Sequence, residues 1–184
     1  MIEAKNLTKY YASGENRFQV LKNISLQIQN GDYVVILGAS GSGKSTLLNV
    51  ISGLERPESG EIRYDNEDIT TFSDNRLTEF RRKNIAFIFQ QYYLLPHMDV
   101  ARALAKNPKV LFLDEPTGAL DEQTGRQVLD YISRLQTEYG FTIVMVTHNL
   151  NIAEMANTVI RMNSGRISEI YTNDTQKTAY EIGW

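Results

Sequence analysis

The stretch GASGSGKST, residues 38–46, decides the fold of this chain. The apolar run YVVIL at residues 33–37 leads into it, and a second, mostly apolar segment at residues 47–51 follows it. The first run has the length and composition of a buried strand, and the second is typical of the buried face of a helix. A strand, a glycine-rich turn and a helix in this order predict a phosphate-binding loop in an α/β protein.

The loop matches the pattern G-x-x-x-x-G-K-[ST], with its fixed positions at Gly38, Gly43, Lys44 and Ser45. Its backbone N–H groups can converge on phosphate oxygens, to which the positive N-terminus of the following helix also points. Lys44 is placed to reach the β and γ phosphates, and the Ser45 hydroxyl to bind Mg²⁺. The alternative is a structural turn with a solvated lysine, which the flanking strand and helix argue against. The expected nucleotide-binding residues of the loop are Gly38, Ala39, Ser40, Gly41, Ser42, Gly43, Lys44, Ser45 and Thr46.

Length and composition indicate one globular domain. The 184 residues are enough for one well-buried core, and the 42% hydrophobic and 22% charged fractions are those of an ordinary soluble protein. No apolar run approaches the roughly eighteen residues of a membrane-spanning helix, and the start MIEAKNLTKYY is too polar for a secretory leader. The absence of cysteine excludes disulfides and thiolate metal sites. These features predict a cytoplasmic protein.

The net charge of −3 argues against a nucleic-acid partner. The triplet Arg81, Arg82 and Lys83 is either a local basic patch or the solvated last turn of a helix, where cations suit the helix dipole. We favour the second interpretation.

Periodicity and turn residues predict short strands early in the chain and a strand–helix alternation after the loop. Expected strands cover residues 2–7, 19–29, 33–37, 61–64, 85–89, 110–113 and 142–146, and a hairpin pairs 159–162 with 167–170. Expected helices cover residues 44–52, 74–82 with Asp74 as the cap, and 122–138, with a short one from Asp99 to Asn107. The pattern indicates an antiparallel layer that leads into a parallel sheet, and the polar residues 173–184 are expected to form a tail.

Candidate catalytic side chains follow the apolar strands directly. Asp114 and Glu115 end one strand, and His148 follows another. Ligands of open parallel sheets bind beyond the carboxyl ends of the strands, so these residues should share one rim with the loop. Asp114 is the expected Mg²⁺ carboxylate, and Glu115 can orient or deprotonate an attacking water. The alternatives are a surface acidic pair and an ordinary exposed histidine.

Side chains at two further places in the sequence are suited to contact a bound nucleotide or its metal ion. The amide of Gln90, at the end of the strand 85–89, can touch both Mg²⁺ and the attacking water, although an exposed glutamine is common at such a place. Tyr10 or Tyr11 can stack on a base, or can simply pack on the sheet.

Four segments together resemble the ATP-binding cassette of ABC transporters. Their amino-acid sequences are most similar to those of the lipoprotein-releasing and macrolide-exporter branch. They are GASGSGKST, FIFQQ at residues 87–91, VLFLDEPTGALD at residues 110–121 and VMVTHN at residues 144–149. The resemblance covers nearly the whole chain and implies a P-loop NTPase core. It assigns adenine stacking to Tyr11, Walker A to residues 38–46, the Q-loop to Gln90, Walker B to Asp114, catalytic base to Glu115, the D-loop to Asp121 and the switch histidine to His148.

The chain departs from this family in one segment. Family members carry an α-helical subdomain and the signature LSGGQ between the Q-loop and Walker B, but here Gln90 precedes Asp114 by only 24 residues. No Ser-Gly-Gly occurs in the sequence. The amino-acid sequence resembles that of the family on both sides of Val100-Ala101, which indicates an excision near 100/101. In the family, the signature of one cassette binds the γ phosphate held by the other, so the resemblance implies ATP binding with impaired hydrolysis.

The sequence therefore predicts a cassette core at residues 1–172, which binds Mg²⁺ and ATP as a transporter subunit. The resemblance implies an integral membrane permease as partner, a homodimer of cassettes that is weakened here, and a peripheral place on the inner face of the cell membrane. A non-catalytic nucleotide-binding scaffold is the alternative. A P-loop kinase is a third possibility, which the segment TGALD at residues 117–121 argues against.

Overall fold

The computed structural model describes residues 1–14, 16–89 and 104–184. The strands are β1 (Ile2–Ser13), β2 (Asn16–Ile28), β3 (Tyr33–Leu37), β4 (Ser59–Tyr64), β5 (Glu67–Asp68), β6 (Ile85–Phe89), β7 (Val110–Asp114), β8 (Thr142–Thr147), β9 (Thr158–Asn163) and β10 (Arg166–Thr172). The α-helices are α1 (Lys44–Ile51), α2 (Asp74–Asn84) and α4 (Glu122–Tyr139), and two 3₁₀ turns are η1 (Ile69–Thr71) and η2 (Ile152–Met155).

The strands form two sheets. The larger sheet has the order β10-β9-β3-β8-β7-β6, with β3 parallel to both β8 and β9 and with β7 parallel to both β6 and β8. The smaller sheet has the order β2-β1-β4-β5 and is antiparallel. This is the α/β P-loop NTPase fold with an N-terminal antiparallel layer, which confirms the fold class expected from the sequence.

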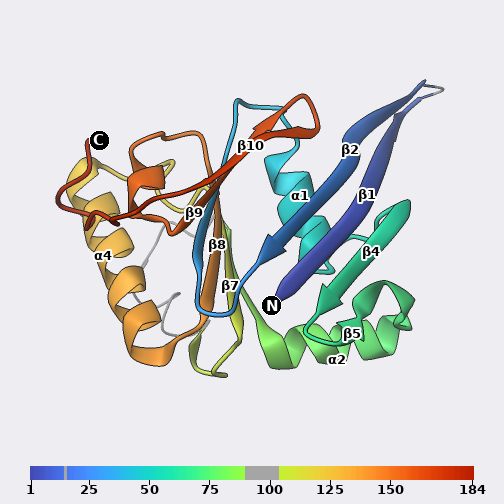
Figure 1. Cartoon of the computed structure of the whole chain (residues 1–184), viewed down its shortest axis with the longest axis horizontal. Coiled ribbons are helices and arrows are strands. Elements are labelled where there is room, and N and C mark those ends of the chain that lie inside the picture. The colour runs from blue at the N-terminus through green and yellow to red at the C-terminus, as the bar shows by residue number, and fades with distance from the viewer. Residues whose placement is uncertain (15, 90–103) are drawn as a thin grey trace.

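The two faces of the larger sheet are covered by different elements. On β3, Val34 and Ile36 belong to one buried cluster, and Tyr33, Val35 and Leu37 belong to the other. The first cluster contains the apolar side chains of α1 and of the smaller sheet, so α1 lies between the two sheets (Figure 1). The second cluster contains the buried side of α4, on the opposite face (Figure 1). Because both faces of β3 are buried, its sequence is continuously apolar.

Some boundaries differ from those expected. β1 continues to Ser13, because Tyr10 and Tyr11 pair with Gln19 and Phe18 of β2 in a long hairpin. The cap of α2 is Ser73 and not Asp74: the Ser73 hydroxyl accepts a hydrogen bond from the backbone N–H of Arg76. Asp74 is the first residue of the helix, where its charge faces the positive end of the dipole. The excision near 100/101 and most of the helix expected between Asp99 and Asn107 lie outside the described residues.

The segment 173–184, expected to be a polar tail, packs along α4 (Figure 1). Ala179 and Ile182 are buried in the cluster on that face of the sheet. The Arg126 guanidinium donates hydrogen bonds to the carbonyl oxygens of both residues, at 2.5 and 2.9 Å. The Trp184 ring lies against Gly125, where a β-carbon would come within 1.9 Å of the ring. The sequence did not show this contact, because it depends on one glycine within a helix.

The contact between Gly125 and Trp184 predicts a coupled effect on stability. Alanine at Gly125 favours a helix intrinsically by up to about 1 kcal/mol, but the indole occupies the space of its methyl group. We expect Gly125→Ala to lower the free energy of unfolding by roughly 1–3 kcal/mol in the parent chain and to be neutral or stabilising in the Trp184→Ala background. Urea unfolding of the four proteins of this cycle measures the coupling, and additive effects would contradict the packing described here.

Candidate functional site

The phosphate loop leaves the N-terminus of α1 free of side-chain caps. Gly43 caps the helix with φ 99°, and Gly41 has φ 76°, both in the left-handed region that favours glycine. Neither a capping side chain nor an acidic residue occupies the first turn of α1. The unpaired N–H groups at the start of a helix need a partner, and the helix dipole favours a negative one. The local backbone therefore fits an anion such as phosphate.

The lysine of the loop supports this fit. The Lys44 ammonium donates hydrogen bonds to the carbonyl oxygens of Gly38 and Ala39, at 2.8 and 3.1 Å, and its side chain is buried. It is thus folded back over the loop with its charge directed at the loop's centre. The Ser42 hydroxyl is buried and, among the described residues, has no hydrogen-bond partner.

Ser45 and Asp114 bring two Mg²⁺-type ligands together. The Ser45 hydroxyl donates to the Asp114 carboxylate at 3.1 Å, which joins the start of α1 to the end of β7. Burial raises the pKa of Asp114; the Ser45 bond and Lys44 oppose this rise, and Glu115 adds to it. Ionisation of a buried carboxyl group is costly, and a bound cation offsets this cost because it stabilises the charged form. In the described part of the chain no three His, Cys, Asp or Glu side chains group into a metal site. Mg²⁺ sites in nucleotide-binding proteins usually have one or two carboxylates and substrate phosphates as ligands.

Glu115 and His148 meet at the same rim. The Nδ1 atom of His148 and the Oε2 atom of Glu115 are 3.0 Å apart, and the histidine is the more exposed of the two. Glu115 has φ 47°, an uncommon conformation for a residue other than glycine, and its N–H donates to the carbonyl of Val146 at 3.0 Å. The bond to β8 holds the backbone turn, and the imidazole orients the carboxylate. The expectation of a shared rim is therefore correct.

One pocket of about 820 Å³ unites these groups. Its polar end is formed by the loop, Asp114, Glu115 and His148, and its apolar end by Tyr11, Phe18 and Val20. Of the predicted site residues, Gly38 and Ser42 belong to the loop without lining the pocket, and Gln90 lies outside the described residues. Phe18 was missed by the sequence analysis. The signal that could have found it is the hairpin register, which pairs Phe18 with Tyr11.

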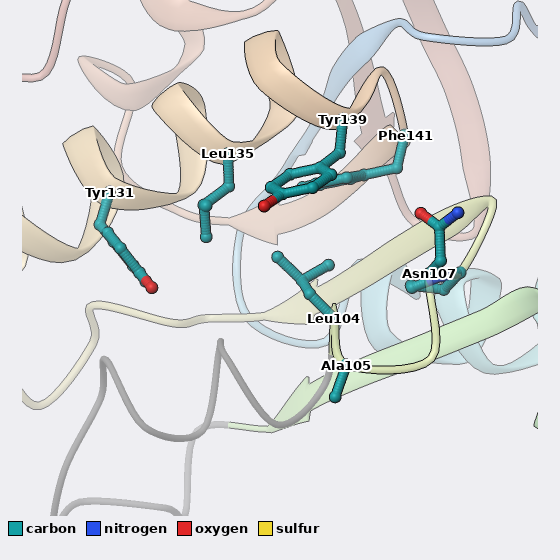
Figure 2. A pocket seen from close by; sticks show the side chains of 8 residues that line it. Leu104, Ala105, Asn107, Tyr131, Leu135, Tyr139 and Phe141 are labelled. Atoms are coloured by element: carbon teal, nitrogen blue, oxygen red, sulfur yellow. The ribbon is translucent and has the colours of Figure 1, made fainter.

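A second pocket, of about 400 Å³, lies between α4 and the segment 104–108. Figure 2 shows Leu104 facing Leu135 and Tyr139 of α4 across it. The described residues that line this pocket include no charged side chain, so it does not suit a polyphosphate. The candidate site is therefore the larger pocket at the loop.

An uncapped helix behind a glycine-rich loop, with a lysine and a hydroxyl–carboxylate pair, defines a P-loop nucleotide-binding protein. A model of the ABC transporter family matches residues 21–101. The uncharacterized ABC transporter ATP-binding protein MJ0796 of Methanocaldococcus jannaschii is 34% identical over 91% of this chain and 95% of its own length. The chain belongs to the ATP-binding cassettes of ABC transporters. The dimeric structure of MJ0796 in a post-hydrolysis state, bound to ADP and Pi, has a TM-score of 0.85 at 32% identity and covers 94% of this chain and 98% of that one.

Other relatives are longer than this chain. The putative ABC transporter ATP-binding protein MG065 homolog of Mycoplasma pneumoniae is 36% identical over the whole chain, which spans 50% of its length. The macrolide export ATP-binding/permease protein MacB of Neisseria meningitidis is 34% identical, and the chain spans 36% of it. The Mycoplasma alignment extends over 234 positions, whereas this chain has 184 residues, so at least 50 positions fall opposite gaps in this chain.

The environment of Asp114 predicts opposite effects on stability and on ligand binding. The folded-state pKa of Asp114 is raised, so the neutral carboxyl group contributes to the stability of the fold at low pH. This contribution is lost as the pH rises and the buried group ionises. We expect Asp114→Asn to raise the melting temperature of the ligand-free protein at pH 7.5 and to weaken Mg²⁺-dependent ATP binding by about tenfold or more.

Thermal melts, together with titrations of ATP in Mg²⁺ and in EDTA, measure the two effects. Asp174→Asn, at an exposed carboxylate in the C-terminal segment, is the matched control and should change neither. A lower melting temperature of Asp114→Asn would contradict the predicted cost of the buried charge.

Proposed function

We propose that this chain is the ATP-binding subunit of an ABC transporter and binds Mg²⁺–ATP in the pocket at the phosphate loop. The observation that carries the proposal is the pocket itself, which brings Lys44, Asp114, Glu115 and His148 to one rim. Cassettes of this family bind ATP and in general hydrolyse it. The residues present fit both the nucleotide and the ion, because the loop offers unpaired N–H groups and the Ser45–Asp114 pair offers oxygen ligands.

In the proposed complex, residues 38–46 hold the phosphates and Tyr11 contacts the adenine. Lys44 exchanges its two carbonyl partners for the β and γ phosphate oxygens, which are stronger acceptors. Ser45, Asp114 and Gln90 hold Mg²⁺, which neutralises charge on the phosphates when it is bound. The Ser45 hydroxyl already lies within hydrogen-bonding distance of Asp114, so these two ligands need little rearrangement.

Glu115 is proposed to orient and deprotonate the attacking water, and His148 to position Glu115. The carboxylate stands at the carboxyl end of β7, next to the loop, and the imidazole limits its rotation through the contact at 3.0 Å. A general base must be held within hydrogen-bond reach of the water that it activates. His148 is also exposed enough to reach a γ phosphate.

Turnover by this chain is proposed to be slow. The sequence contains no Ser-Gly-Gly and therefore no family signature, which in intact cassettes completes the site of the opposite subunit. The family match that ends at residue 101 and the at least 50 gapped positions of the Mycoplasma alignment support an excision near 100/101. Binding depends on groups that the chain has, whereas full stabilisation of the transition state depends on groups that it lacks.

The proposed partner is an integral membrane permease, and the proposed place is the inner face of the cell membrane. No helix in the described ranges is long and apolar enough to cross a bilayer. MacB of Neisseria combines, by its name, an ATP-binding part with a permease, and this chain corresponds to about a third of it. The MJ0796 structure is a dimer, and the missing signature predicts a weakened dimer here.

Titration of the purified chain with Mg²⁺–ATP, together with a phosphate-release assay, tests the proposal. We expect saturable binding and a turnover below about 1 s⁻¹, the lower end of typical enzymes. Lys44→Ala should weaken binding by more than about tenfold, because it removes a charge-assisted contact to phosphate. Robust, cooperative hydrolysis would contradict the impaired turnover.

The same assay distinguishes the alternative, a non-catalytic scaffold, which the missing signature favours. A scaffold binds ATP without any turnover and does not dimerise with ATP, even as the Glu115→Gln variant. An impaired enzyme instead loses its residual turnover in Glu115→Gln while it still binds ATP.

A further inference from the structure

The apolar end of the pocket contains two aromatic rings from one hairpin. Tyr11 of β1 and Phe18 of β2 are register partners, so their side chains lie on the same face of the sheet. The ring centroids are 6.5 Å apart, and the ring planes meet at 61°. Two rings at this angle form a corner: a flat molecule that lies on one ring meets the other at its edge.

Tyr11 is already engaged by protein groups. Its hydroxyl donates a hydrogen bond to Oε2 of Glu55 at 2.7 Å, and Glu55 in turn accepts one from the Asn49 side chain at 3.0 Å. The Lys9 ammonium lies 5.7 Å from the centroid of the Tyr11 ring. These contacts fix the orientation of Tyr11 and place a cation near its ring, so its surface is only partly available to a ligand.

Phe18 is the more available ring. It is 49% exposed although it lines the pocket, and in the described part of the chain its one ring contact is with Tyr11. The neighbouring Arg17 stacks on Tyr10, at 4.3 Å from the ring centroid. Because alternate residues of a strand point to opposite faces, this pair lies on the other side of the hairpin and does not cover Phe18.

We propose that Phe18 is a base-stacking residue, the second aromatic wall of the subsite that receives the base of a bound nucleoside triphosphate. This inference rests on the proposed function and extends it to a residue that the family resemblance does not assign. The base lies in the corner between the rings of Tyr11 and Phe18 and contacts both. Every nucleobase has a π face, so such a corner recognises a planar aromatic group rather than one pattern of hydrogen bonds. The remaining residue at this end, Val20, is apolar.

The distance between this corner and the phosphate loop is fixed by backbone packing. A β-carbon at Gly43 of the loop would lie 3.1 Å from the Val20 carbonyl oxygen, two residues beyond Phe18. The strand that carries Phe18 therefore packs directly on the loop that receives the phosphates. A base in the corner and a triphosphate on the loop are parts of one continuous pocket.

Comparison of two ligands tests this role. Mg²⁺–ATP has a base, and Mg²⁺–tripolyphosphate offers only the phosphates. We expect Phe18→Ala to weaken ATP binding roughly 5- to 150-fold, the range measured for loss of one stacked base contact, and to leave tripolyphosphate binding unchanged. Phe18→Tyr, which keeps the ring, should restore ATP binding to within about threefold of the parent. Tyr139→Ala removes an exposed aromatic side chain outside this pocket and is the matched control.

The outcomes separate this inference from the proposed function. Parent-like ATP binding by Phe18→Ala, or an equal loss for ATP and tripolyphosphate, overturns the stacking role while nucleotide binding by the parent still stands. Failure of the parent to bind either ligand overturns the proposed function, and the inference with it. A selective loss for ATP, rescued by Phe18→Tyr and absent from Tyr139→Ala, establishes Phe18 as the second wall.

Discussion

The close backbone packing of three segments on the phosphate loop is the contact on which the site depends. The N–H of Gly165, in the turn between β9 and β10, donates to the carbonyl of Ser42 at 3.0 Å, and the carbonyl of Gly165 accepts from Lys22 of β2 at 2.8 Å. A β-carbon at Gly165 would come within 2.3 Å of the Val20 carbonyl, and one at Gly38 within 2.6 Å of the Met162 carbonyl. Only glycine permits these approaches, and they join the loop to both sheets.

This packing explains why residues far apart in the sequence line one pocket. The larger sheet brings the ends of β3, β7 and β8 side by side, and so places Ser45 next to Asp114 and Glu115 next to His148. The smaller sheet contributes the aromatic end through β2, which the turn at Gly165 holds against the loop. Both sheets therefore contribute to the pocket. A change at the turn would alter the spacing between the aromatic end and the polar end of the pocket without touching either.

The sequence was sufficient for features that depend on local patterns. The strands around residues 33–37, 110–113 and 142–146 follow from continuous apolar runs, and the meeting of Glu115 with His148 follows from the rule that carboxyl ends share a rim. The sequence was not sufficient for features that tertiary contacts determine. Phe18 was missed because the hairpin extends beyond the expected strand ends, and the packing of residues 173–184 depends on the space that Gly125 leaves for Trp184. Capping by Ser73 instead of Asp74 shows that boundaries shift by one residue when adjacent positions are both good caps.

The proposed function separates the binding of a nucleotide from its turnover. In the proposed complex, affinity for phosphates would arise from N–H groups, Lys44 and the Ser45–Asp114 pair, which the fold brings together within one chain. Catalysis needs interactions that strengthen only as charge develops in the transition state, and uniform binding of substrate and transition state does not supply them. Glu115 lies 3.0 Å from His148 within this chain, and in the proposed complex the γ phosphate would lie at the open rim of the pocket. A pocket open on that side admits water and leaves developing charge without fixed donors. In the proposed function, the same geometry that favours ATP binding would therefore limit hydrolysis to what one wall of a site can stabilise.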